Sequence, residues 1–185
     1  MKDNKKGFTL VELLAVIVIL ALIMGIAVVS IGGVLNSARQ STFKDTALSV
    51  IHGVSQQVTL ANQLPASGSA SYAFEAKILE KGGDSPLGGS IKFVGGLSNG
   101  KVNMSSTSTA NNQDAVAIGG MGIYKITGTV PACSDKVNSY VTISKDSTTN
   151  VYSYSVCLTA GEGYKYIEGT ENELLDSNNT AVIKP

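Results

Sequence analysis

The chain has 185 residues, of which 43% are hydrophobic and 15% are charged, with 20 Gly and no Trp. This composition is too apolar and too lightly charged for a disordered chain. Basic and acidic residues number 14 each, so no overall charge favours nucleic acid as a partner. The length allows one ordinary domain and an additional segment.

Positive charge is concentrated at the N-terminus, ahead of a long apolar run. The first seven residues carry three Lys and one Asp, and the seventeen residues from Leu13 to Val29 are all apolar, one Gly included. As a helix, residues 13–35 would extend about 34 Å, which is enough to cross a bilayer core of about 30 Å. Lys residues before such a span favour a cytoplasmic N-terminus.

A secretory signal peptide and a plain membrane anchor are the simplest explanations of this run. A secretory signal has a shorter apolar core followed by small residues at its cleavage site, and the run here is too long. An anchor fits the length but does not explain Glu12, which lies at the start of the apolar run. An ionised carboxylate in hydrocarbon costs about 2.5–3.5 kcal/mol. No cationic side chain follows before Arg39, so the same helix offers Glu12 no partner.

Residues 5–14, with the sequence Lys-Lys-Gly-Phe-Thr-Leu-Val-Glu-Leu-Leu, closely resemble the class III signal sequence of type IV prepilins. The resemblance implies that a prepilin peptidase cuts between Gly7 and Phe8, and that Phe8 becomes the N-methylated first residue. It also implies that Glu12, the fifth mature residue, forms an intersubunit salt bridge with the Phe8 amine of a neighbouring subunit. Many family members carry a Pro midway along this helix, and this chain does not.

The segment after the apolar run has a different pattern. Phe43, Ala47, Val50, Val54, Val58 and Ala61 follow one another by three or four residues, whereas Asp45, His52, Gln56, Thr59 and Gln63 lie opposite. This spacing predicts an amphipathic helix over 37–64. The helix is expected to end at Leu64, because the residue before a Pro disfavours helical geometry.

Strand-like runs dominate the remainder. They are Ile91–Val94, Lys101–Met104, Ala115–Ile118, Gly122–Thr127, Tyr140–Ser144 and Val151–Leu158. Asn99-Gly100 predicts a hairpin turn between the first two runs, and residues 145–150 form the loop between the last two. A short helix is predicted over Ala73–Lys81, and the polar residues 159–185 are not assigned. Strands after a helix predict an α+β fold with an antiparallel sheet, and the resemblance implies the type IV pilin fold.

These patterns, together with what the resemblance implies for the leader and the filament core, divide the chain into five segments. They are a leader at 1–7, a transmembrane and filament-core helix at 8–36, an amphipathic helix at 37–64 that packs on the sheet, a connecting region at 65–90, and an antiparallel sheet with a C-terminal tail at 91–185.

The two cysteines, Cys133 and Cys157, are 24 positions apart. In an exported domain the default expectation is a disulfide, worth about 3–4 kcal/mol, and many pilins carry such a bridge. Two reduced buried thiols are the alternative.

Enzymatic chemistry is not expected. His52 is the only histidine and lies on the polar face of a predicted helix, so neither a serine triad nor a zinc site is indicated. Residues 95–101 imitate a phosphate-binding loop, but they lead into a strand instead of a helix. No metal and no cofactor are predicted.

The resemblance is to a major pilin of Gram-positive, clostridial type. It implies a homopolymer of identical subunits that is anchored in the membrane before assembly and is extracellular afterwards. Prepilin peptidase, a platform protein and cytoplasmic ATPases are the implied partners, and no nucleic acid is expected. A minor pilin or a pseudopilin of a secretion or DNA-uptake system is the alternative within the family. A membrane-anchored binding domain that never polymerises is the alternative outside it.

Overall fold

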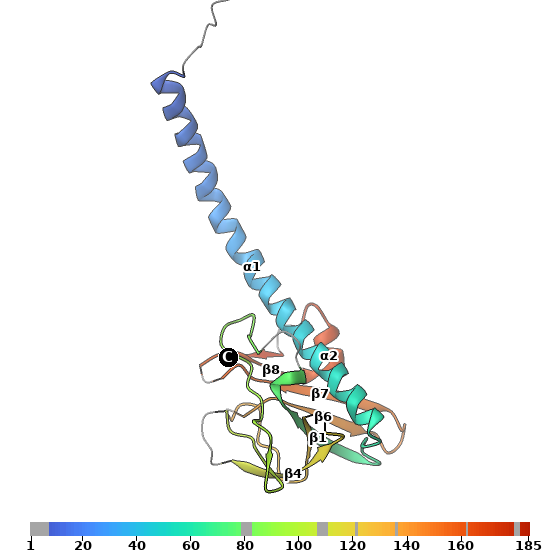
Figure 1. The fold of residues 1–185 in the computed structure, drawn as a ribbon. Helices are drawn as coiled ribbons and strands as arrows, with labels where there is room; N and C mark the ends of the chain where they lie inside the picture. Colours follow the sequence, from blue (N-terminus) through green and yellow to red (C-terminus); the bar gives the residue numbers. More distant parts are fainter. Residues whose placement is uncertain are drawn as a thin grey trace, which may run out of the picture. The chain divides into compact units, whose positions relative to one another are not determined.

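The computed structural model describes residues 8–78, 83–106, 111–120, 122–135, 137–161, 163–179 and 182–185, with only the backbone at 28–30. The leader, including Gly7, therefore lies outside the described residues. Residues 1–38 and 39–185 form two separate compact units. Helix α1, Leu10–Leu60, contributes to both units, and the other elements belong to the second (Figure 1).

In the first unit, α1 continues without interruption through Gly25 and the pair Gly32-Gly33. Each of these glycines costs about 1 kcal/mol in a helix, yet the backbone stays helical. No Pro is present to remove a backbone hydrogen bond, so the helix has no enforced break.

In the second unit, α1 presents an apolar stripe to a sheet. Phe43, Ala47, Val50, Val54 and Val58 are at most 1% exposed, as the sequence pattern predicts, and Ile51 joins them. The opposite positions, including Asp45 and His52, are exposed. The stripe packs on Tyr72, Phe74, Val141, Ile143, Val156, Leu158 and Ile167 of the sheet. The predicted α+β architecture, a long helix followed by an antiparallel sheet, is confirmed.

Helix α1 ends at Leu60, four residues before the predicted end at Leu64. Asn62 adopts a left-handed conformation with φ of 52°. Its amide donates to the Thr59 carbonyl oxygen at 3.0 Å, and the next amide donates to that of Val58 at 3.0 Å. This is a Schellman cap with Asn in place of the usual Gly, and it ends the helix before the following Pro has any effect.

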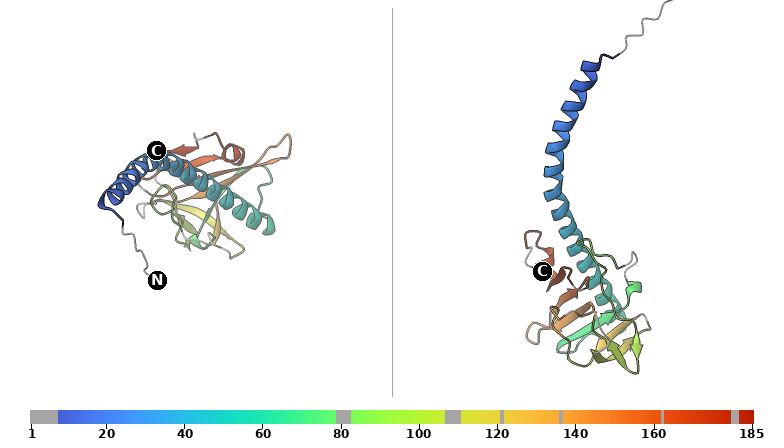
Figure 2. Two further views of the ribbon diagram at one scale, coloured as in Figure 1. Left: turned by 90° about the horizontal axis from the view of Figure 1, so that it is seen from above. Right: turned by 90° about the vertical axis from the view of Figure 1, so that its left-hand side faces the viewer.

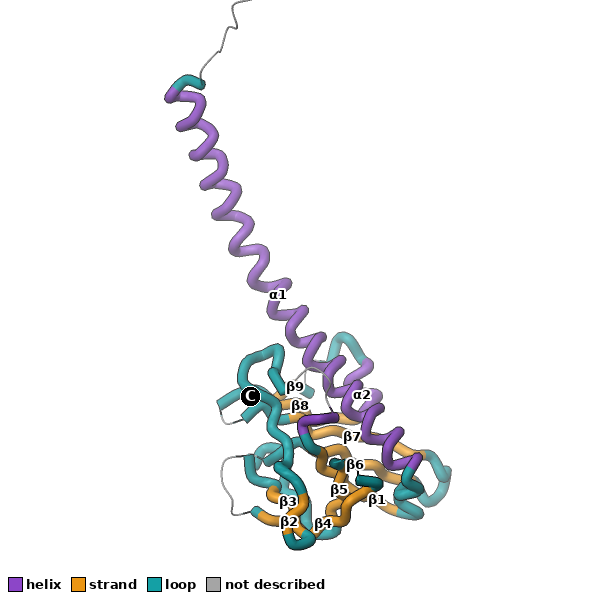
Figure 3. Tube along the Cα trace, in the orientation of Figure 1, coloured by secondary structure: helices purple, strands orange, loops and turns teal. Residues whose placement is uncertain are grey.

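In the part of the chain that the structure describes, the sheet contains nine antiparallel strands in the order β2-β3-β4-β5-β1-β6-β7-β8-β9. Their bounds are β1 Gly68–Phe74, β2 Leu97–Ser98, β3 Lys101–Asn103, β4 Asn112–Ile118, β5 Ile123–Ile126, β6 Tyr140–Lys145, β7 Tyr152–Leu158, β8 Tyr166–Thr170 and β9 Ile183–Lys184. A short helix α2, Glu171–Leu175, and a single 3₁₀ turn, Ala76–Ile78, complete the elements. Figure 3 shows the strands as one layer beside the C-terminal part of α1.

Several predicted elements need correction. Ile91–Val94 is not a strand, because its amides donate to carbonyls of different segments: Lys92 to Thr159 at 2.8 Å and Val94 to Phe74 at 3.3 Å. The helix predicted over Ala73–Lys81 is wrong at its start, where the chain is still in β1. The 3₁₀ turn occupies part of the remainder, and 79–81 lie outside the described residues.

The predicted Asn99-Gly100 turn is present, but it joins β2 to β3. Both residues have positive φ, 51° and 71°, as a two-residue hairpin requires. The predicted hairpin loop at 145–150 connects β6 to β7.

Two tyrosine hydroxyls attach the turn after α1 to the sheet. Tyr72 of β1 donates to the Gln63 carbonyl oxygen at 2.6 Å, and Tyr152 of β7 donates to that of Pro65 at 3.2 Å. Burial raises the pKa of Tyr72 to about 12. The hydroxyl therefore stays protonated and keeps donating throughout the neutral range.

Helix α2 lies beside the C-terminal part of α1, as the two further views in Figure 2 also show. Lys44, only 6% exposed, donates from Nζ to the Asp176 carbonyl oxygen at 2.9 Å. The exposed His52 places Nε2 at 2.9 Å from Glu171 Oε1. The otherwise polar C-terminal tail is fixed to the helix by these contacts.

Candidate functional site

The first candidate site is the start of α1. Thr9 precedes the first helical residue, and Glu12 is the third residue of the helix. Glu12 Oε2 accepts hydrogen bonds from the Thr9 amide and from Thr9 Oγ1, both at 2.8 Å. The Glu12 amide donates in return to Thr9 Oγ1 at 3.3 Å. This reciprocal pattern is a capping box, which satisfies amides that a helix start otherwise leaves unpaired.

The capping box gives Glu12 a local partner that sequence reasoning missed. The Thr-x-x-Glu spacing was available as the signal for it. The carboxylate also lies at the positive end of the helix dipole, which favours negative charge. Both Thr9 bonds end on Oε2, and no described residue donates to Oε1. One carboxylate oxygen therefore remains open to a further cation or donor.

The helix around this site is apolar on all sides and is not covered by its own chain. The side chain of Phe8 is 86% exposed, that of Leu13 61% and that of Val34 71%. Among the described residues, α1 is the one helix that is long and apolar enough to cross a membrane. An apolar helix without a covering face requires lipid or other protein chains around it. Phe8 and Glu12 thus lie at the N-terminal end of a segment that requires lipid or other protein chains around it.

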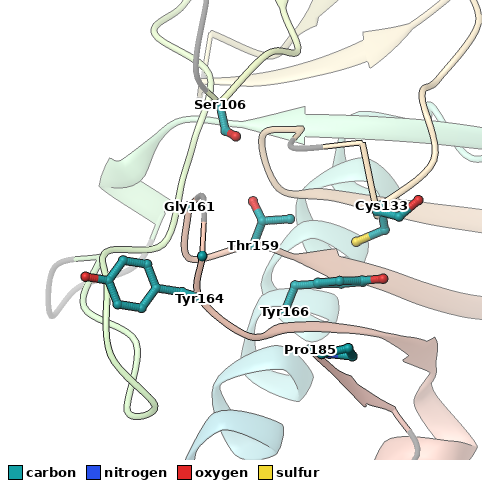
Figure 4. Close-up of a pocket in the computed structure, with 9 residues that line it drawn as sticks. Ser106, Cys133, Thr159, Gly161, Tyr164, Tyr166 and Pro185 are labelled. Atoms are coloured by element: carbon teal, nitrogen blue, oxygen red, sulfur yellow. The ribbon is translucent and has the colours of Figure 1, made fainter.

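The second candidate site is the disulfide region of the second unit. Cys133 and Cys157 of β7 are joined by a disulfide, and both are at most 2% exposed. A hollow of about 150 Å³ lies next to the bond. Figure 4 shows Cys133 and Tyr166 at one side of this hollow and Tyr164 at the other.

Lys101 and His52, the candidates for phosphate binding and for catalysis, form other contacts in the structure. Lys101 is the last residue of the segment 95–101 that resembles a phosphate-binding loop. Its Nζ lies 2.6 Å from Oδ1 of Asp114 on the neighbouring strand β4. The ring of His52 contacts Glu171, and the nearby Ser55 hydroxyl donates to the His52 backbone carbonyl oxygen at 3.0 Å instead of to the ring. Within the described ranges, no group of three or more His, Cys, Asp or Glu side chains is arranged to hold a metal ion.

Comparison with known proteins bears on the first site. Residues 2–28 match the family model of the prokaryotic N-terminal methylation motif. Searches of curated proteins and of solved structures found no match. Together with the long apolar helix and the antiparallel sheet, the motif supports a protein of the type IV pilin-like or pseudopilin class. More particularly, the match over residues 2–28 supports a type IV pilin-like prepilin with a class III signal peptide.

The motif implies processing by prepilin peptidase and assembly into pilus-type machinery. The motif and the apolar helix fit membrane anchoring before assembly. A motif of this kind suggests a structural role.

Proposed function

We propose that the chain is the major structural subunit of a type IV pilus, with surface filaments that serve adhesion, aggregation and twitching motility. The observation that carries the proposal is an acidic side chain at the start of a helix whose apolar side chains are exposed on all sides. Identical helices would cover one another in the filament core. Contacts between identical subunits that do not close into a ring produce an open filament.

Assembly would depend on Phe8 and Glu12. Prepilin peptidase would cut after Gly7, and the new amine at Phe8 would be N-methylated. The amine of one subunit would then pair with Glu12 of the next. The cost of a carboxylate in hydrocarbon, about 2.5–3.5 kcal/mol at the centre of a segment, would fall only when the subunits are in register. The open Oε1 of Glu12 supports this pairing, because the capping box uses only Oε2.

The capping box creates a rival explanation of Glu12 that an experiment must separate from pairing. If capping were the whole role, Gln would keep the capping hydrogen bonds and filaments would form normally, since a capping box accepts Gln at this position. If pairing with an amine is the role, Gln fails because it lacks the negative charge. We therefore expect Glu12→Gln to leave processed monomers in the membrane and to reduce sheared filaments to a few per cent of wild type.

The second unit provides a matched control. Thr170 and Glu173 form a capping box at the start of α2, with Glu173 Oε2 at 2.7 Å from the Thr170 amide and 2.9 Å from Oγ1. Glu173→Gln makes the same chemical change in the same hydrogen-bond pattern, and filaments should remain at wild-type abundance. Normal filaments in Glu12→Gln would refute the pairing mechanism.

Leader cleavage and the distinction between a major and a minor subunit need separate measurements. Gly7→Asp should block cleavage, so the mass of the purified chain should retain residues 1–7. In the wild type, the mature chain should begin at N-methylated Phe8. A major subunit should dominate the sheared filament fraction, whereas a minor pilin or a pseudopilin would be a trace component there. Cytoplasmic ATPases and a platform protein would drive the assembly.

A further inference from the structure

The face of the sheet that points away from α1, here called the outer face, carries a row of hydroxyl groups. Successive side chains of a strand point to opposite faces, and Val141 and Val156 belong to the core under α1. Their neighbours in the sequence therefore point outward. The strand register places Ser71, Thr142, Ser155 and Thr170 side by side on β1, β6, β7 and β8.

Part of this row lines a shallow hollow of about 300 Å³ over β6, β7 and β8. Thr142, Ser155 and Thr170 contribute hydroxyls, and Tyr140 and Glu168 contribute an aromatic ring and a carboxylate from the next row of the register. The volume is at the small end of the range for ligand pockets, about 300–1,000 Å³. It suits one small polar molecule or one unit of a polymer.

Several groups in the hollow are held in place by the fold. Tyr140 donates to the Pro131 carbonyl oxygen at 3.2 Å, and Thr142 Oγ1 lies 2.7 Å from Ser71 Oγ. Burial, followed by the charges of Glu168 and Asp135, raises the pKa of Tyr140 to about 12. The ring thus stays neutral. Groups on strands with fixed rotamers form a preorganised surface, which reduces the entropy lost on binding.

Other groups in the hollow have hydrogen-bonding capacity left over. No described residue makes a side-chain hydrogen bond with Ser155 or Glu168. Lys184 of β9 lines the same hollow and supplies its one positive charge. Glu173 is occupied by the capping box of α2 and keeps its negative charge. With Glu168, the charges of the hollow therefore sum to −1. The hollow offers a carboxylate acceptor, hydroxyls that both donate and accept, an ammonium donor and a ring.

We propose that this hollow on the outer face binds a neutral sugar unit of a surface polysaccharide. A sugar ring carries adjacent hydroxyls, which a carboxylate and paired Ser or Thr hydroxyls can bond together, and C–H groups that pack on an aromatic ring. The net negative charge of the hollow disfavours acidic sugars. The inference deepens the proposed adhesive role and rests on the second unit facing the outside of the filament.

The test uses the full chain in detergent micelles, so it does not depend on filament assembly. Methyl glycosides of glucose, galactose, mannose and N-acetylglucosamine are the probes, with sialic acid as the acidic comparison, and saturation-transfer NMR measures binding. We expect at least one neutral glycoside to bind with an affinity in the millimolar range and sialic acid to bind more weakly. Glu168→Gln and Ser155→Ala should each weaken binding, by up to about 10-fold for the charged group.

Ser153→Ala is the matched control. Ser153 lies on the same strand and the same face as Ser155, two residues away and outside the hollow. Its removal should leave binding unchanged. Binding of none of the neutral glycosides, or equal binding by the Glu168 variant and the wild type, would overturn the proposal. If the wild-type chain binds a neutral glycoside but forms no filaments, the proposed assembly is refuted, whereas the proposed sugar site is retained.

Discussion

Reduction of the disulfide should lower the stability of the second unit by a predictable amount. Cys133 and Cys157 are 24 positions apart, so the bond closes a loop of 25 residues that includes all of β6. The chain-entropy relation for a loop of this length gives about 3.5 kcal/mol at 25 °C. Residues 39–185 form a unit of 147 residues (185 − 39 + 1). For that size, each kcal/mol shifts the melting temperature by about 2–4 °C. The expected decrease is therefore about 7–14 °C.

Tyrosine circular dichroism is a suitable assay, because all seven tyrosines lie between Tyr72 and Tyr166 and report on the second unit alone. The full chain in detergent micelles would be heated with and without reductant, and alkylation followed by mass measurement would verify that both buried thiols are free. The double variant Cys133→Ala/Cys157→Ala should melt at the reduced value and should not respond to reductant. Equal melting of the oxidised and reduced wild type would refute the reasoning, since the loop would then be restrained without the bond.

Three further predictions concern the helices. Asn62→Ala should destabilise the second unit by about 1–2 kcal/mol, because Ala disfavours the left-handed φ of 52°; Asn62→Gly at the same position should not, and thermal melting compares the two. The hydrogen bonds from Thr170 to Glu173 hold the pKa of that carboxyl below its ordinary value of 4.5. Their stabilisation is complete above pH 4.5 and is lost as the pH falls through the lowered pKa. The melting difference between wild type and Glu173→Gln should accordingly shrink in that acidic range, and a pH-independent difference would contradict this. Val54→Ala removes two buried methyl groups at 0% exposure and should cost about 2 kcal/mol by chemical denaturation. Leu60→Ala, at 69% exposure, should cost under about 0.5 kcal/mol.

The sequence predicts well the elements in which hydrophobic periodicity is strong. The stripe from Phe43 to Val58 specifies one buried face, and that face is present. β7 forms as predicted, but its burial does not alternate, because Cys157 is buried together with Val156 and Leu158. β1 was not predicted as a strand because its first residues are small and polar and only Tyr72 and Phe74 give a core pattern. Ile91–Val94 was predicted as a strand on β propensity alone. Its amides instead connect two different segments, which no local pattern can reveal.

The candidate site was predictable to a different extent. The motif identifies Gly7, Phe8 and Glu12 by residue type and spacing, and the family comparison over residues 2–28 agrees with the motif. The role of each of these residues stays a prediction. The buried-charge argument for Glu12 predicts a distant cation, whereas its nearest donors belong to Thr9, three residues away. The hollow on the outer face depends on the register of three strands, one of which, β8, was not predicted at all.

The position of β1 has a consequence for how the chain acquires its structure during synthesis. β1 follows α1 directly, yet it lies inside the sheet, where Ser71–Phe74 pair with β5 and Gly68–Ala73 pair with β6. Phe74 precedes Ile123, the first residue of β5, by 49 positions (123 − 74). Both edges of β1 therefore stay unpaired until β5 has been delivered, and unpaired edges invite aggregation. The edge that pairs with β6 is covered only once β6 has arrived, so a nascent chain that stalls before Lys145 would leave this edge exposed.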